Sequence, residues 1–207
     1  MGILPVTIFG RAVPILAVRY GTTCLNTGYE AENEGEPVPN APYENLLFNY
    51  VKKMEKATFG GGCFWGVEAA FRKVKGVVST SVGYMGGHFP NPCYLDVLSR
   101  ITGHAEVAQV EYDPEKVSYE QLLDLFWSIH DPTTLNRQGP DRGEQYRSVI
   151  FFHNQEQEVL ARLSKQKLQV SGKFDKDIVT EIKPASDYYL ADEYHQQYFE
   201  KKQRSLT

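Results

Sequence analysis

Hydrophobic and polar positions follow two different periods along most of this 207-residue chain. Apolar residues spaced three and four apart predict amphipathic helices, and short runs rich in β-branched and aromatic residues predict strands. The predicted strands cover residues 56–61, 77–84, 105–112, 146–153 and 177–184. The predicted helices cover residues 64–74, 119–130, 154–170 and 191–202. Two polar stretches between them, residues 86–94 and 133–145, are expected to be loops, and long loops often carry sites.

Several helix ends carry local signals. Ser118 and Asn154 each precede a periodic segment and are predicted N-caps, because their side chains can accept a bond from a free backbone N–H. Gly76 is expected to end the helix that begins near Phe64.

The strands and helices are interspersed without a repeating βαβ unit. This order predicts the α+β class, with a mixed, mostly antiparallel sheet and packed helices forming a two-layer sandwich. Residues 58–207 are expected to form this domain, and residues 1–57 an N-terminal extension and linker. Within that extension, residues 31–42 are polar and rich in proline, and residues 43–54 could form a short amphipathic helix.

Charge and composition narrow the classes of partner. The net charge is −4, and lysine and arginine are scattered, so no nucleic-acid partner is expected. No stretch is long and apolar enough to cross a membrane. Three cysteines, an odd and low number, favour a reducing compartment such as the cytoplasm, and no C-x-x-C spacing suggests zinc. Residues 1–29 carry two arginines and no acid, which leaves organelle targeting open.

The stretch FGGGCFWG, residues 59–66, joins three glycines, a cysteine and two large rings. It falls between a predicted strand and a predicted helix, so the helix N-terminus is expected to lower the pKa of Cys63 from about 8.5. Glycines leave the backbone bare, so a substrate could approach the sulfur. Phe64 and Trp65 cannot both be core residues of the helix, and at least one is expected to flank the thiol as an apolar wall.

Glu106 is the best-marked acid. Strand alternation places it on the same face as Ala108, Val110 and Tyr112, where desolvation would raise its pKa and let it deliver a proton near neutral pH. Tyr94 and Tyr146 border the two polar loops and could hold a polar oxygen beside such an acid.

The glycine–cysteine stretch has two other functional interpretations. A dinucleotide-binding turn would need glycine at the position of Trp65, so it is excluded. A cysteine hydrolase would need a histidine base, and spacing singles out none of the five histidines: His88, His104, His130, His153 and His195. An inert, buried cysteine at a tight turn also remains open.

Four motifs, in order and spacing, resemble the A-type methionine sulfoxide reductases, the peptide-methionine (S)-S-oxide reductase family, from residue 57 to residue 204. They are GCFWG at 62–66, GHAEV at 103–107, RQGPDRGEQYRS at 137–148 and EYHQQY at 193–198. The resemblance implies repair of oxidised methionine, free or in proteins, with Cys63 as the nucleophile that becomes a sulfenic acid. It also implies Glu106 as the proton donor, assisted by Tyr94 and Tyr146. The implied substrate-binding residues are Phe64, Trp65 and Asp141.

The resemblance implies no metal or organic cofactor, but an external thiol reductant: thioredoxin, glutaredoxin with glutathione, or dithiothreitol. The family's glycine-rich tail with recycling cysteines has no counterpart in the final KKQRSLT. Three routes of recycling therefore stay open: direct reduction by an external thiol, ranked first, then Cys24, then Cys93. The protein is expected to be a monomer.

Overall fold

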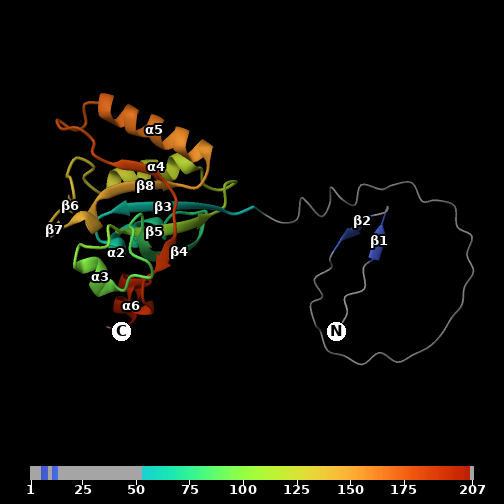
Figure 1. Ribbon diagram of the computed structural model, residues 1–207. Helices are drawn as coiled ribbons and strands as arrows, with labels where there is room; N and C mark the ends of the chain where they lie inside the picture. Colours follow the sequence, from blue (N-terminus) through green and yellow to red (C-terminus); the bar gives the residue numbers. More distant parts are fainter. Residues whose placement is uncertain (1–5, 9–10, 14–52, 206–207) are drawn as a thin grey trace, which may run out of the picture. The chain divides into compact units, whose positions relative to one another are not determined.

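The computed structural model describes residues 6–8, 11–13 and 53–205 (Figure 1). The chain divides into two compact units, residues 1–43 and 44–207. In the first, β1 (Val6–Ile8) and β2 (Arg11–Val13) pair antiparallel.

Some sequence expectations fall outside the described part. They concern the targeting segment at residues 1–29, Cys24, the linker at residues 31–42 and most of the helix expected at residues 43–54. The last two residues of that expected helix, Lys53 and Met54, are described and are not helical.

The second unit is built on a six-stranded sheet in the order β10-β4-β5-β3-β8-β9. Its strands are β3 (Glu55–Gly61), β4 (Val77–Met85), β5 (Ala105–Tyr112), β8 (Ser148–Phe152), β9 (Glu181–Pro184) and β10 (Tyr188–Leu190). Neighbouring strands are antiparallel except β8 and β9, which are parallel. The predicted α+β class with a mixed, mostly antiparallel sheet is confirmed.

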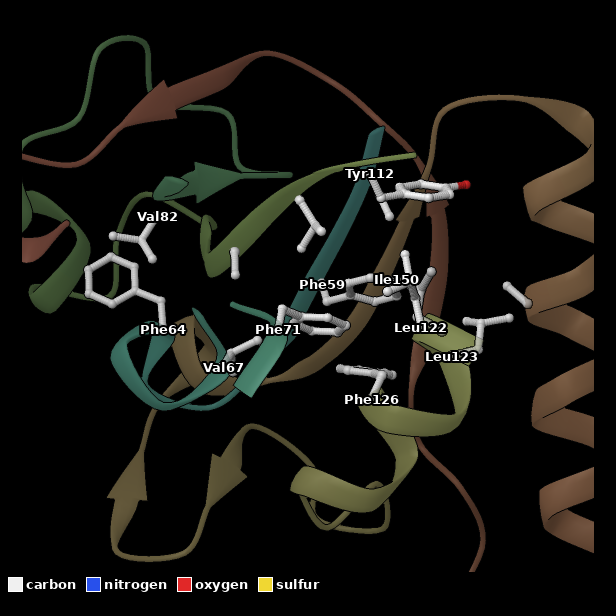
Figure 2. Close-up of a cluster of buried hydrophobic side chains, with 14 of the residues drawn as sticks. Phe59, Phe64, Val67, Phe71, Val82, Tyr112, Leu122, Leu123, Phe126 and Ile150 are labelled. Carbon is white, nitrogen blue, oxygen red and sulfur yellow. The ribbon is translucent and has the colours of Figure 1, made fainter. Parts of the chain in front are cut away.

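Three helices form the second layer. They are α2 (Phe64–Phe71), α4 (Tyr119–Ile129) and α5 (Gln155–Val170); α4 contacts both α2 and α5, and all three contact the sheet (Figure 1). Figure 2 shows the core between the layers, where side chains of α2 and α4 meet those of the central strands. A smaller apolar cluster, which includes Met85, Val107 and Phe151, lies on the other face of the sheet.

The local signals that the sequence carries explain these helices. Ser118 accepts the N–H of Gln121 while the Gln121 side chain accepts the N–H of Ser118, a capping box that confirms the predicted start of α4. Asn154 accepts the N–H of Gln157 and caps α5 as predicted. Helix α2 is shorter than predicted: it ends at Phe71, although Gly76 has the positive φ of +112° expected beyond a helix end.

The predicted helix over residues 191–202 is wrong in its first half. A 3₁₀ turn, η2 (Glu193–His195), comes first, and α6 (Tyr198–Arg204) starts later. Gln197 between them has a positive φ of +53°, because its N–H donates to Glu68 Oε2 at 2.8 Å instead of continuing a helix.

The remaining differences lie in short elements. The loop expected at residues 86–94 is followed by α3 (Tyr94–Leu98), and the loop expected at residues 133–145 contains a hairpin of β6 (Arg137–Gln138) and β7 (Asp141–Arg142). Before β8 the chain forms a 3₁₀ turn, η1 (Glu144–Tyr146), so β8 begins two residues later than predicted, and β9 begins four residues later. Strand β10, at the sheet edge, was not predicted.

Candidate active site

Cys63 lies at the junction of β3 and α2, as the N-cap residue of the helix. The glycines before it are required by close packing. A Cβ on Gly60 would lie 2.8 Å from Val149 Cγ1, closer than real side chains approach. Gly62 has φ of +102°, and a Cβ there would lie 2.6 Å from the Gln138 side chain. The bare backbone thus lets β8 and the β6–β7 hairpin pack directly against the cysteine turn.

Glu106 joins this turn from the neighbouring strand. It lies on β5 with 2% of its surface exposed, and the N–H of Phe64 donates to its Oε2 at 3.1 Å. Burial raises the pKa of Glu106 to about 7; the Phe64 N–H opposes this rise, and the nearby charge of Asp141 adds to it. The expectation that strand alternation buries this carboxyl and raises its pKa is confirmed.

The expected lowering of the Cys63 pKa is wrong. Burial raises the pKa of the thiol to about 11, and the negative charges of Glu106 and Asp141 contribute to the rise. The backbone N–H groups of Trp65 and Gly66 lower it, as a helix N-terminus should, but they do not compensate. The thiol form therefore predominates in the free protein at neutral pH.

Two tyrosines and an aspartate reach the same place from the loops. Tyr94 is the first residue of α3, Tyr146 ends η1, and Asp141 begins β7. Burial raises the pKa of Tyr146 to about 12, and burial also raises the pKa of Tyr94. In both cases the charges of Glu106, Cys63 and Asp141 contribute, so these five groups lie close enough to affect one another's ionisation.

Asp141 is held near Cys63 by the hairpin. The Gln138 side chain accepts the N–H of Asp131 at 3.1 Å and donates to its carbonyl at 3.0 Å, and its methylene carbons lie against Gly62. The loop predicted to be polar and structureless is thus tied to the cysteine turn.

Phe64 lies in the core and Trp65 lies nearer the surface, so the two are not both core residues, as expected. Phe64 is 1% exposed and belongs to the core between the layers (Figure 2). Trp65 is half-buried, and its ring stacks on Tyr198 of α6 with ring centroids 3.7 Å apart and planes at 7°. One apolar side chain next to the thiol is therefore partly open to solvent.

Sequence reasoning assigned no role to two further residues of this region. Tyr84 of β4 lies opposite Glu106 in the sheet register, and burial followed by the Glu106 charge raises the pKa of its phenol. His195 accepts the indole N–H of Trp65 at its Nδ1, at 3.1 Å. Its place in the EYHQQY motif was the available signal, but nothing in the spacing linked it to Trp65.

The other cysteine and the remaining histidines occupy separate positions. Cys93 is exposed and precedes α3, where its N–H donates to Asp96 Oδ2 at 2.8 Å. His104 bonds the backbone of Gly87 and Phe89, and His130 bonds Phe126 and Ser148.

His153 bonds Thr58, and His195 already bonds Trp65. The ring hydrogen bonds of these four histidines go to groups other than the Cys63 thiol, so the structure singles out none of the four as the base of a cysteine hydrolase.

The arrangement brings a cysteine thiol together with a carboxyl whose pKa of about 7 leaves it partly protonated at neutral pH and with two phenols, and an apolar ring follows the cysteine in the chain. Such a site can bind a polar oxygen and protonate it while sulfur attacks the atom that bears it. Within residues 53–205, no three side chains of His, Cys, Asp or Glu are grouped as metal ligands would be. No helix of that part combines the length and apolar character needed to cross a membrane.

A family model described as "Peptide methionine sulfoxide reductase" matches residues 55–207. Peptide methionine sulfoxide reductase MsrA 1 of Nostoc sp. is 81% identical over 149 residues, which cover 72% of this chain and 91% of that protein. The crystal structure of Mxr1 from Saccharomyces cerevisiae in reduced form is 39% identical, with a TM-score of 0.69, covering 73% of this chain and 87% of Mxr1. The crystal structure of Mxr1 in complex with Trx2 is 30% identical, with a TM-score of 0.51, covering 72% of this chain and 86% of Mxr1.

Proposed function

This chain belongs to the peptide methionine sulfoxide reductase family and is an oxidoreductase, and we propose that Cys63 and Glu106 carry its chemistry. The proposed substrate is the S epimer of methionine sulfoxide, free or in oxidised proteins. The observation that carries the proposal is the buried carboxyl of Glu106, whose pKa of about 7 keeps a proton available beside the sulfur.

Oxygen is a poor leaving group from the sulfoxide unless it is protonated. We assign this proton to Glu106, with the Tyr94 and Tyr146 hydroxyls as further donors to the oxygen. Binding of the oxygen among these donors makes the substrate sulfur more electrophilic. The Cys63 sulfur then attacks the substrate sulfur. The thiol proton passes to the Glu106 carboxylate, which forms when Glu106 gives its own proton to the oxygen.

The electrons balance within this step. Attack of the Cys63 sulfur on the substrate sulfur forms a sulfur–sulfur bond. That bond and the sulfoxide S–O bond break as the oxygen passes to the Cys63 sulfur, so methionine sulfoxide gains two electrons and Cys63 loses two. The products are methionine and a sulfenic acid on Cys63, whose hydroxyl carries the proton given by Glu106, while the Glu106 carboxylate takes up the proton that the thiol lost. A second thiol then condenses with the sulfenic acid, which forms a disulfide and releases water.

The asymmetry of the site supports selection of one epimer. Oxygen donors come from Glu106, Tyr94 and Tyr146, while the apolar ring of Trp65 offers a place for the methyl group. When the oxygen and the methyl are fixed, the direction of attack by Cys63 admits only one configuration at sulfur. The choice of the S epimer follows the family resemblance.

Recycling is proposed to use an external thiol. A complex of Mxr1 with Trx2 supports a thioredoxin as the partner of this chain. Cys93 is exposed and Cys63 half-buried, and Cys24 lies outside the described residues. Thiol counting after one turnover without reductant tests which thiol reduces the sulfenic acid on Cys63. Loss of one thiol with a trappable sulfenic acid supports reduction by an external thiol. A mapped Cys63–Cys24 or Cys63–Cys93 disulfide overturns that route.

The proposal is tested with the full chain and dithiothreitol. Wild type should release methionine from methionine sulfoxide and leave the R epimer of a racemic mixture behind. Cys63→Ser should release none, because a serine hydroxyl is a far weaker nucleophile than a cysteine sulfur, while the matched variant Cys93→Ser should still turn over with dithiothreitol. Glu106→Gln should bind substrate yet turn over about 10²–10⁴-fold more slowly. Activity in Cys63→Ser, or an unchanged rate in Glu106→Gln, removes that residue from the mechanism.

A further inference from the structure

We infer that His195 and Tyr198 are positioning residues for Trp65, which they hold as the apolar wall that selects the methyl group of the substrate. The inference rests on the proposed function of the site, because a wall matters only if a sulfoxide binds there. It adds a role for the C-terminal segment, residues 191–198, in substrate selection.

Two different contacts fix the indole. The flat face of Trp65 stacks on Tyr198, with centroids 3.7 Å apart and planes at 7°. The edge of the ring is fixed separately, because Nε1–H donates to His195 Nδ1 at 3.1 Å. A stack alone leaves a ring free to rotate in its own plane, and a hydrogen bond alone leaves it free to swing. Together they define both the plane and the orientation of the indole.

His195 connects this wall to the rest of the site. Its side chain is 1% exposed, and its ring centroid lies 5.1 Å from that of Phe64 and 4.7 Å from that of Tyr94. The imidazole therefore contacts both Trp65, which is assigned to the substrate methyl, and Tyr94, which is assigned to its oxygen.

The tautomer of His195 follows from its bond to Trp65. Nδ1 can accept the indole N–H only when it carries no proton, so a neutral ring has its hydrogen on Nε2. Burial lowers the pKa of His195, which favours this neutral form. Nε2 is buried and has no hydrogen-bond partner among the described residues.

The segment that carries these two residues is itself anchored on both sides. Gln196, next to His195, bonds both the N–H and the carbonyl of Val82 on β4 through its side chain, each at 2.8 Å. Gln197, next to Tyr198, donates its N–H to the buried carboxylate of Glu68 on α2 at 2.8 Å. Helix α6, which begins at Tyr198, contacts α2, the helix that follows Cys63 (Figure 1). The anchored backbone leaves His195 and Tyr198 little freedom to follow a displaced indole.

The first readout is discrimination between a methyl and an ethyl group, measured as the ratio of kcat/KM for methionine sulfoxide to that for ethionine sulfoxide. A hydrophobic site distinguishes one methylene by about 10–200-fold. In His195→Leu the ratio should fall about fivefold or more, mainly through KM for the methyl substrate, because leucine cannot accept the indole N–H. His195→Asn should keep more of the ratio, because Asn Oδ1 can occupy the place of Nδ1 as an acceptor.

The stack is tested separately with Tyr198, which is half-buried, so that its variants are expected to fold. Tyr198→Ala removes the ring and should lower the ratio, whereas Tyr198→Phe retains the stack and should restore it. This pair decides the inference even if His195→Leu does not fold.

The second readout observes the indole directly. The chain has two tryptophans, so a ¹⁵N-labelled protein gives two indole N–H signals, and Trp127→Phe assigns them. His195→Leu should shift the Trp65 signal and speed its exchange with water, and His195→Asn should do so less. An unchanged Trp65 signal together with an unchanged methyl-to-ethyl ratio in His195→Leu and Tyr198→Ala overturns the inference. Failure of the proposed function is separate: then wild type would not reduce methionine sulfoxide, or Cys63→Ser would still do so.

Discussion

The buried carboxyl of Glu106 should make folding stability depend on pH, and Glu106→Gln isolates that dependence. In the folded protein the pKa of Glu106 rises from an ordinary value of 4.5 to about 7, chiefly through burial. Between these two values the folded state binds more protons than the unfolded state. Stability from this group is therefore fully present below about pH 4.5 and is lost as the pH rises through about 7.

The size of the effect follows from the two pKa values. Each pKa unit corresponds to about 1.4 kcal/mol, so ionising Glu106 costs the fold about 3 kcal/mol. Glutamine cannot ionise, yet its side-chain oxygen can still accept the N–H of Phe64. The difference in unfolding free energy, variant minus wild type, should thus grow by about 3 kcal/mol from pH 4.5 to pH 8 and then stay level. For a domain of this size that is about 6–12 °C in Tm.

The assay is urea unfolding of both proteins in reducing buffer at intervals between pH 4.5 and 8.5. Groups that titrate in the same way in wild type and variant contribute equally to both unfolding free energies, so their contributions cancel in the difference. Glu111→Gln is the matched control, since it removes a carboxylate from the same strand where the side chain is partly exposed. If the Glu106→Gln difference stays flat between pH 4.5 and 8, Glu106 is not protonated by its burial, and the assignment of this residue as the acid loses its physical basis.

Three further predictions follow from the same geometry. The single-turnover rate of oxygen removal should fall as the pH rises above about 7, because Glu106 loses its proton, and Glu106→Gln should lack this break; a wild-type rate that rises steadily to pH 9 contradicts it. Iodoacetamide at pH 8 should alkylate exposed Cys93 faster than Cys63, and Glu106→Gln should speed the reaction at Cys63 because a nearby negative charge is gone; peptide mapping measures both rates. Gly62→Ala should destabilise the fold by more than about 2 kcal/mol in urea, whereas Gly139→Ala, also at positive φ but with open space around it, should cost only about 1–2 kcal/mol; equal losses would exclude the packing against Gly62.

Local signals predicted the parts of the fold that depend on local contacts. The caps of α4 and α5 are formed by residues three positions apart, so their start points were correct. The alternation of side chains that marked Glu106 also depends on one strand alone, and the burial of Glu106 is confirmed.

Long-range contacts explain what the sequence did not reveal. The helix predicted over residues 191–202 is interrupted because Gln197 bonds Glu68, a residue 129 positions earlier. The raised pKa of Cys63 depends on burial and on the charges of Glu106 and Asp141, which come from a different strand and from a hairpin. A helix N-terminus alone, visible in the sequence, predicted the opposite direction.

The raised pKa of Cys63 indicates how Cys63 and Glu106 work together. A thiol with a pKa of about 11 is almost entirely protonated at neutral pH, and the Glu106 charge is part of the reason. Once Glu106 holds its proton, that charge is absent, so the state that can deliver an acid proton is also the state that favours thiolate at Cys63. Oxidants that attack free thiolates meet little of that form in the resting site. A sulfoxide oxygen that hydrogen-bonds to protonated Glu106 selects the same state, and the helix N-terminus then acts on the Cys63 sulfur with less opposing charge.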